Sequence, residues 1–94
     1  MAVNTFYLRI VSAKKIFFSG RCVSIIVPVA DGQEEILAHH ENMVNAVENG
    51  VLKYKPEGAD EYTTVVVGTG FAQIINNRVT VLVETAELPE EIDK

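Results

Sequence analysis

Residues 62–84 read YTTVVVGTGFAQIINNRVTVLVE, and this stretch decides the fold class. It consists of three short apolar runs rich in β-branched residues, separated by turn segments at 68–70 and 76–77. Runs of this length between glycine and asparagine turns are typical of antiparallel strands, because valine and threonine pack well on a pleated surface. The stretch therefore predicts three consecutive strands.

The N-terminal segment shows a cleaner form of the same pattern. Phe6, Leu8 and Ile10 recur at every second position, so they share one face of an extended chain. The intervening residues, which share the opposite face, are Tyr7, Arg9 and Val11. This alternation predicts a half-buried strand.

Turn dipeptides divide the middle of the chain. We expect Ser19-Gly20 to separate a short strand at 16–18 from a longer one at 22–29. Asn49-Gly50 is the preferred filling of a type I′ turn, so residues 43–55 are predicted to form a β-hairpin.

Together these patterns predict an all-β protein, a single flattened β-sandwich or barrel of about ten short antiparallel strands. The segment from Asp31 to Asn42 is predicted to be a charged loop in which Ile36 and Leu37 pack inward. Pro89 followed by two glutamates is a helix opening. We therefore divide the chain into a β-sandwich domain at 1–88 and the truncated start of a C-terminal helix at 89–94.

Composition argues against several classes of partner. The 94 residues carry a net charge of −5, which opposes a phosphate backbone or an anionic lipid surface. No apolar run approaches the roughly 20 residues of a membrane span. Cys22 is the only cysteine, so an intrachain disulfide is excluded. We expect no nucleic-acid partner and no direct insertion into a membrane.

The residue types that carry chemistry do not form a catalytic pattern. His39-His40-Glu41 is the only cluster with metal-ligand side chains, and it lacks further ligands at a useful spacing. Cys22 lies in an apolar run, as core thiols do, and Gly68-Thr69-Gly70 is not followed by the Lys-Ser/Thr of a phosphate loop. Lys14-Lys15 and Arg21 are expected to form a small basic spot for a protein contact. These residues predict a non-catalytic domain without a cofactor or a metal.

Several strings resemble the N-terminal β-sandwich of the epsilon subunit of F-type ATP synthases, called delta in mitochondria. The resemblance covers nearly the whole chain. The strings that carry it are FYLRIVSA at 6–13 with Phe-Ser-Gly at 18–20, Asn-Gly-Val-Leu at 49–52, GFAQI at 70–74, NRVTVLVETAE at 77–87 and Glu-Ile-Asp at 91–93. Residues 32–42 differ from the family pattern Gly-x-x-Gly-x-Leu-Pro-Gly-His-Ala-Pro, because they keep Gly32, an aliphatic pair and His40 but lack Pro-Gly and Ala-Pro.

The resemblance implies a rotor subunit that joins the gamma subunit to the ring of membrane subunits, the c-ring, and couples proton or sodium flow to ATP synthesis. It implies a peripheral location on the cytoplasmic side of the cell membrane, and no enzymatic activity of the chain's own. The family's C-terminal helical hairpin is expected to be absent. The alternative is a stand-alone cytoplasmic module of the same fold that binds another protein.

The same resemblance assigns residues to the two partners. Those expected to face the gamma subunit are Ser12 and His40, with Tyr7, Val11 and Met43 supplying exposed apolar area. Those expected to face the c-ring are Gly32, Gln33 and Glu34.

Overall fold

The computed structural model describes residues 4–92 of the chain. The strands are β1 (Phe6–Val11), β2 (Ile16–Val29), β3 (Gly32–Leu37), β4 (Met43–Val47), β5 (Gly50–Pro56), β6 (Thr63–Val67), β7 (Gly70–Ile75), β8 (Arg78–Val83) and β9 (Ala86–Glu87). One short helix, α1 (Pro89–Ile92), follows them. The predicted all-β fold is confirmed, with nine strands among the described residues.

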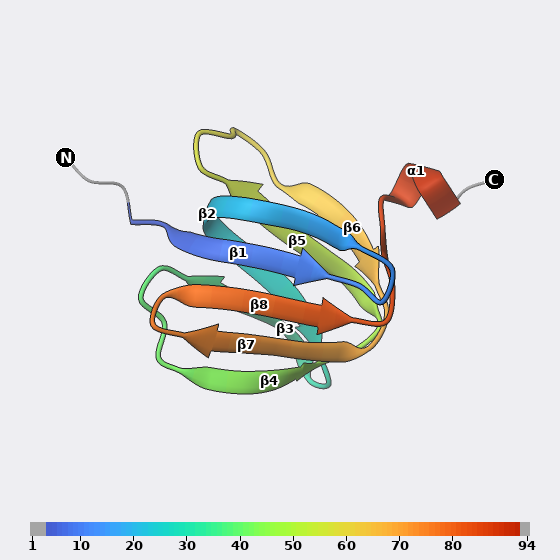
Figure 1. The fold of residues 1–94 in the computed structure, drawn as a ribbon, viewed down its shortest axis with the longest axis horizontal. Helices are drawn as coiled ribbons and strands as arrows, with labels where there is room; N and C mark the ends of the chain where they lie inside the picture. The colour runs from blue at the N-terminus through green and yellow to red at the C-terminus, as the bar shows by residue number, and fades with distance from the viewer. Residues whose placement is uncertain (1–3, 93–94) are drawn as a thin grey trace.

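The strands form two layers around a common core (Figure 1). Their order is β4-β7-β8-β1-β2-β5-β6-β9, with β3 also paired to β2. We call β4, β7, β8, β1 and the first half of β2 the first layer. The second layer consists of the rest of β2 with β3, β5, β6 and β9. Each layer turns one face to the core and the other to solvent.

Strand β2 connects the layers. Its residues from Ile16 to Cys22 pair with β1, and those from Ser24 onward pair with β3 and β5. The register with β5 shifts between Cys22 and Ser24, and such irregularities let a strand pass from one sheet to another. The predicted turn at Ser19-Gly20 is therefore wrong. Both residues pair with β1, and this continuous ladder overrides the turn preference of the dipeptide.

The core follows the predicted alternation. Phe6, Leu8 and Ile10 of β1 are fully buried, as are Val81 of β8 and Leu52 of β5. Burying a side chain of this size contributes about 1.5–3 kcal/mol, so these positions supply much of the stability of so small a domain.

The predicted hairpin across 43–55 does not form. β4 pairs with β7 in the first layer, whereas β5 pairs with β2 and β6 in the second. The backbone N–H of Glu48 donates to the carbonyl of Pro28 at 3.0 Å, where the chain passes from one layer to the other. Asn49-Gly50 thus belongs to a connection between the two layers. The turn preference of this dipeptide wrongly predicted that β4 pairs with β5.

Three further expectations need correction. Residues 32–37 are a strand, β3, that pairs with β2 over six positions, so this part of the predicted loop is regular structure. Within it Ile36 is fully buried as expected, but Leu37 is 51% exposed because neighbouring strand residues face opposite sides. The predicted strands were all antiparallel, whereas β1 and β8 pair in parallel.

The short helix α1 begins at Pro89, where the sequence predicts a helix start, and lies at the end of the molecule where β1 and β8 end (Figure 1). Residues 93 and 94 of the predicted C-terminal segment lie outside the described residues. Within residues 4–92, no helix has both the length and the apolar character needed to cross a bilayer.

Gly70 is a position where any side chain would collide with the backbone. A Cβ added there would lie 1.8 Å from the carbonyl oxygen of Leu82, on the paired strand β8. We predict that Gly70→Ala lowers the free energy of unfolding by about 3 kcal/mol, because the β7–β8 ladder must shift. Urea unfolding measures this change.

The matched control is Gly20→Ala, also within a strand. Its added Cβ would meet only the ring tip of Phe18 at 3.2 Å, and that ring can move. We expect a loss of about 1 kcal/mol or less there. Equal losses for the two variants would contradict the prediction.

Candidate functional site

The solvent face of the first layer carries an exposed apolar row at one end. The strand registers place Val11 of β1 beside Leu82 of β8, Leu82 beside Phe71 of β7, and Val11 beside Ile16 of β2. Phe71 is 57% exposed, Ile16 53% and Leu82 46%. We call Ile16, Val11, Leu82 and Phe71 the apolar row.

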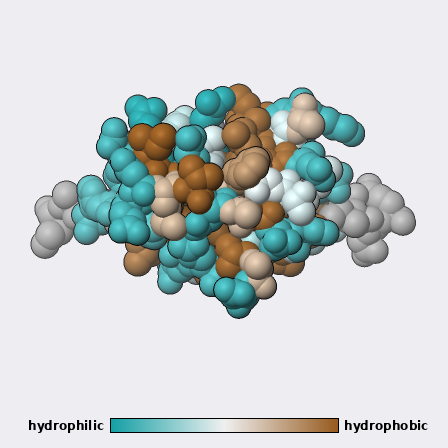
Figure 2. Space-filling model, turned by 90° about the horizontal axis from the view of Figure 1, so that it is seen from below, coloured by the Kyte–Doolittle hydropathy of each residue, from teal (hydrophilic) through white to brown (hydrophobic). Residues whose placement is uncertain are grey.

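A shallow hollow of about 350 Å³ lies over this row. Its lining includes Val11, Phe71 and Leu82 together with Ser12 and Ala13. Val44 of β4 adds a further side chain, 59% exposed. Figure 2 views the molecule from the side of β4 and shows apolar side chains interrupting the hydrophilic surface there. Contiguous exposed apolar area of this kind marks protein contacts more often than small-molecule sites.

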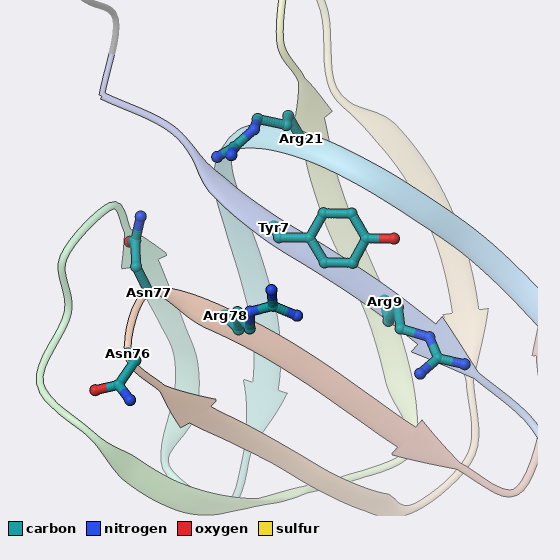
Figure 3. Close-up of a pocket in the computed structure, with 6 residues that line it drawn as sticks. All are labelled: Tyr7, Arg9, Arg21, Asn76, Asn77 and Arg78. Atoms are coloured by element: carbon teal, nitrogen blue, oxygen red, sulfur yellow. The ribbon is translucent and has the colours of Figure 1, made fainter.

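The other end of the same face is cationic (Figure 3). A hollow of about 520 Å³ is lined there by Tyr7, Arg9, Arg21, Asn76, Asn77 and Arg78. The register places Tyr7 between Arg78 on β8 and Arg21 on β2. The guanidinium carbon of Arg78 lies 5.8 Å from the centre of the Tyr7 ring, a cation–π distance. We call this region the arginine hollow.

The expected basic spot of Lys14, Lys15 and Arg21 is wrong. Arg21 pairs with Tyr7 near the start of β1, whereas the lysines lie in the turn after the end of β1. Arg21 instead shares its surroundings with two arginines that are distant in sequence. Only the strand register brings these three residues together, so the sequence pattern could not reveal the hollow.

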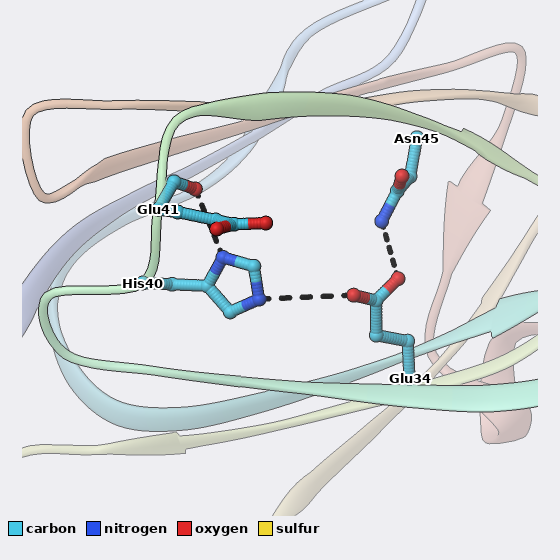
Figure 4. A network of polar contacts seen from close by, with 4 residues as sticks. All are labelled: Glu34, His40, Glu41 and Asn45. Atoms are coloured by element: carbon cyan, nitrogen blue, oxygen red, sulfur yellow. Dashed lines mark hydrogen bonds and ion pairs between the residues drawn. The ribbon is translucent and has the colours of Figure 1, made fainter.

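A polar network joins β3 to the loop before β4 (Figure 4). His40 Nε2 lies 3.8 Å from Glu34 Oε2, and Asn45 Nδ2 donates to the other oxygen of the same carboxylate. His40 Nδ1 lies 2.9 Å from the backbone carbonyl of Glu41. The structure therefore brings together Glu34 and His40, which the resemblance assigns to different partners.

The same loop is tied to the β7–β8 turn. The backbone N–H of His39 donates to Asn77 Oδ1 at 2.7 Å, and that of Asn76 donates to Asn42 Oδ1 at 2.9 Å. His39 has a φ of 65°, a left-handed conformation. Glycine adopts this conformation at less cost, and His39 stands where the family pattern has the glycine of Pro-Gly.

The other residues predicted to form the site lie in different parts of the fold. Ser12 follows the end of β1, whereas His40 lies near its start, where His39 bonds to the β7–β8 turn. Six strand residues separate these ends, about 20 Å, so Ser12 and His40 do not meet. Gly32 and Gln33 are exposed at the tip of the β2–β3 hairpin.

Met43 was predicted to supply exposed area, but it packs against the core. Its neighbour Val44 is the exposed residue of this strand, because adjacent side chains point to opposite faces. Sequence reasoning therefore placed Tyr7, Val11 and Ser12 on this surface but missed Val44, Phe71 and Leu82. Their alternation with the buried Ala72, Val81 and Val83 was the available signal.

Cys22, the single cysteine, lies in the core with no exposed surface. Burial raises the pKa of its thiol from 9.0 to about 12. The thiolate is therefore absent at neutral pH, which suits a structural residue. Among the described residues, no group of three or more acidic, histidine or cysteine side chains is placed to hold a metal ion.

Residues 5–89 match the family model of the ATP synthase delta/epsilon chain, β-sandwich domain. The chain belongs to this family. It is 39% identical over 89 residues to the ATP synthase epsilon chain of Ruminiclostridium cellulolyticum, covering 95% of this chain and 65% of that one. It is 46% identical over 70 residues to the epsilon chain of Symbiobacterium thermophilum, covering 74% and 49%. The chain thus spans roughly half to two thirds of the length of these family members.

Chains in two solved ATP synthase structures share the fold. A chain of the Euglena gracilis mitochondrial ATP synthase, from its OSCP/F1/c-ring assembly, superposes with a TM-score of 0.87 at 24% identity, over 96% of this chain and 57% of that one. A chain of the Tetrahymena thermophila enzyme, from its central stalk and c-ring, gives 0.76 at 14% identity, over 92% and 68%. The two-layer arrangement is therefore shared with chains of both assemblies.

We predict that Cys22 is unreactive toward thiol reagents at about pH 8 until the protein unfolds, since it is buried and protonated. Because the folded-state pKa is the higher one, folding favours the thiol. This contribution to stability is complete below pH 9.0, the ordinary pKa, and is lost as the pH rises toward about 12.

The comparison is an exposed thiol introduced by Asp31→Cys in a Cys22→Ala background. Labelling rates with and without denaturant distinguish the two sites. Reaction of native Cys22 as fast as that of the residue at position 31 would show that the thiol is accessible.

Proposed function

We propose that this chain is a non-catalytic rotor subunit of an F-type ATP synthase, held against the gamma subunit by the solvent face of its first layer. The apolar row is the observation that carries the proposal. Four neighbouring strands contribute to it, and three of its side chains are about half exposed. In a domain that belongs to the delta/epsilon family, such a row suits a permanent contact with another subunit.

The c-ring contact is proposed for the β2–β3 hairpin. Gly32 and Gln33 are exposed at its tip. The Glu34–His40–Asn45 network and the bonds to Asn77 support the hairpin and the following loop from behind. A tip supported in this way can transmit torque, because these contacts resist bending of the hairpin under load. The proposal includes a peripheral location on the membrane complex, on the cytoplasmic side.

The family relationship supports the role without requiring chemistry. The solved relatives come from assemblies described as OSCP/F1/c-ring and as central stalk and c-ring. Coupling in such a rotor needs stable interfaces rather than a reactive group. The buried, protonated Cys22 fits this role, since it leaves the core thiol inert.

Substitution within the apolar row tests the gamma contact. We predict that Leu82→Asp weakens the complex with the cognate gamma subunit by about 30-fold, because a carboxylate would be buried in the interface core. Ser12 lines the edge of the hollow over the apolar row. Ser12→Glu should therefore weaken the complex with the gamma subunit less than Leu82→Asp does. Neither change should lower the melting temperature by more than a few degrees, since both side chains lie outside the core.

The matched control is Val51→Asp on β5. Val51 is 40% exposed in the second layer, so its solvent face points away from the proposed contact. Calorimetric titration with the gamma subunit measures all three variants. If the wild-type chain does not bind its cognate gamma subunit, the rotor proposal fails and the stand-alone interaction module takes its place.

A further inference from the structure

All three arginines of the chain line the arginine hollow. They come from three neighbouring strands, Arg9 from β1, Arg21 from β2 and Arg78 from β8. The protein as a whole has a net charge of −5, so this concentration of positive charge runs against its composition. A local field of opposite sign to the rest of a surface selects for a partner of complementary charge.

The contacts that these arginines make leave their charge uncompensated. Across residues 4–92 the side-chain ion pair joins His40 to Glu34, and it involves none of these arginines. Arg21 donates to the hydroxyl of Thr5 at 3.3 Å, and Arg78 lies over the Tyr7 ring. A guanidinium has five N–H donors in a planar fork that matches a carboxylate. The hollow therefore presents unused donors to solvent.

The spacing of the arginines favours several carboxylates over one phosphate. Arg21 and Arg78 flank Tyr7 on opposite neighbouring strands, so their backbones lie about 10 Å apart. Arg9 is two residues along β1 from Tyr7, about 7 Å away on the same face. Figure 3 shows the three guanidinium groups pointing in different directions rather than toward one point. A single phosphate group is smaller than this spacing, whereas an acidic protein segment can offer one carboxylate to each arginine.

We propose that the arginine hollow receives an acidic segment of the same partner that covers the apolar row. This inference rests on the proposed function, because it takes the gamma subunit as that partner. On β1, Tyr7 lies in the arginine hollow and Val11 in the apolar row. These two residues are four positions apart, about 13 Å along the strand. On a partner helix lying along the strands, this distance corresponds to about nine residues. The partner segment thus carries an apolar anchor and, about nine residues of helix away, a group of acidic residues.

Charge reversal in the hollow tests the proposal against the cognate gamma subunit. We expect Arg9→Glu and Arg78→Glu each to weaken binding about tenfold or more, and the milder Arg78→Gln to weaken it less. The matched control is Lys53→Glu, an exposed cation on β5 in the second layer, which should change binding less than twofold. Raising NaCl from about 50 to about 300 mM should weaken wild-type binding several-fold and affect the Arg9→Glu/Arg78→Glu double variant much less.

These outcomes separate the two proposals. If Leu82→Asp disrupts the complex while the arginine variants bind like wild type at both salt concentrations, the rotor proposal stands and the acidic-segment proposal is overturned. Melting temperatures of the variants confirm that each is folded before it is compared.

A partner-free measurement keeps the inference testable if the gamma subunit does not bind. Here the probe is a fluorescently labelled poly-L-glutamate peptide titrated with the chain at low salt. Binding that is lost in the Arg9→Glu/Arg78→Glu variant and kept in Lys53→Glu supports the proposal, and absence of binding overturns it. Inorganic phosphate and ATP serve as competitors. Displacement of the peptide by either one at low millimolar concentration would identify a phosphate site instead.

Discussion

The backbone ladder of β2 holds the two layers together. This 14-residue strand pairs with β1 along its first half and with β3 and β5 along its second, so both layers depend on one continuous segment. Cys22, at the change of partner, has no exposed surface. A chain of this size has too few residues to build two independent sheets and bury a core between them. Sharing a strand gives it a sandwich from a single sheet.

Alternation along the strands separates stability from recognition. In β1 the even positions Phe6, Leu8 and Ile10 fill the core, while Tyr7, Arg9 and Val11 form part of the solvent face. The two sets never exchange roles, because a shift of one residue would move the whole apolar set to the wrong side. The outer positions are therefore free to differ among proteins that share this core. Leu82 and Arg78 on β8 lie on the same outer face, beside Val11 and Tyr7.

The features that could be predicted from the sequence are those that a local pattern of residues determines. The strands within residues 62–84 follow from short alternating runs and their turns, and the buried face of β1 follows from its period of two. The continuity of β2 and the pairing of β4 with β7 depend on partners distant in sequence, so the local turn signals at Ser19-Gly20 and Asn49-Gly50 were misleading. The same limit applies to the candidate site. The exposure of Tyr7 and Val11 follows from the alternation within their own strand. The arginine hollow, in contrast, exists only through the register of three strands. Met43 was expected to be exposed but packs against the core, because adjacent residues of a strand face opposite sides.

The parallel pairing of β1 with β8 has a consequence for how the protein is made. β1 leaves the ribosome well before β8 (Arg78–Val83), which is one of its two neighbours in the sheet. Until then the edge of β1 that will meet β8 is unpaired, and Leu8 and Ile10 lack their neighbours Val79 and Val81. Contacts between strands that are distant in sequence form slowly, and exposed strand edges favour aggregation in the meantime. The nascent chain is therefore exposed to aggregation at this edge until β8 has been synthesised.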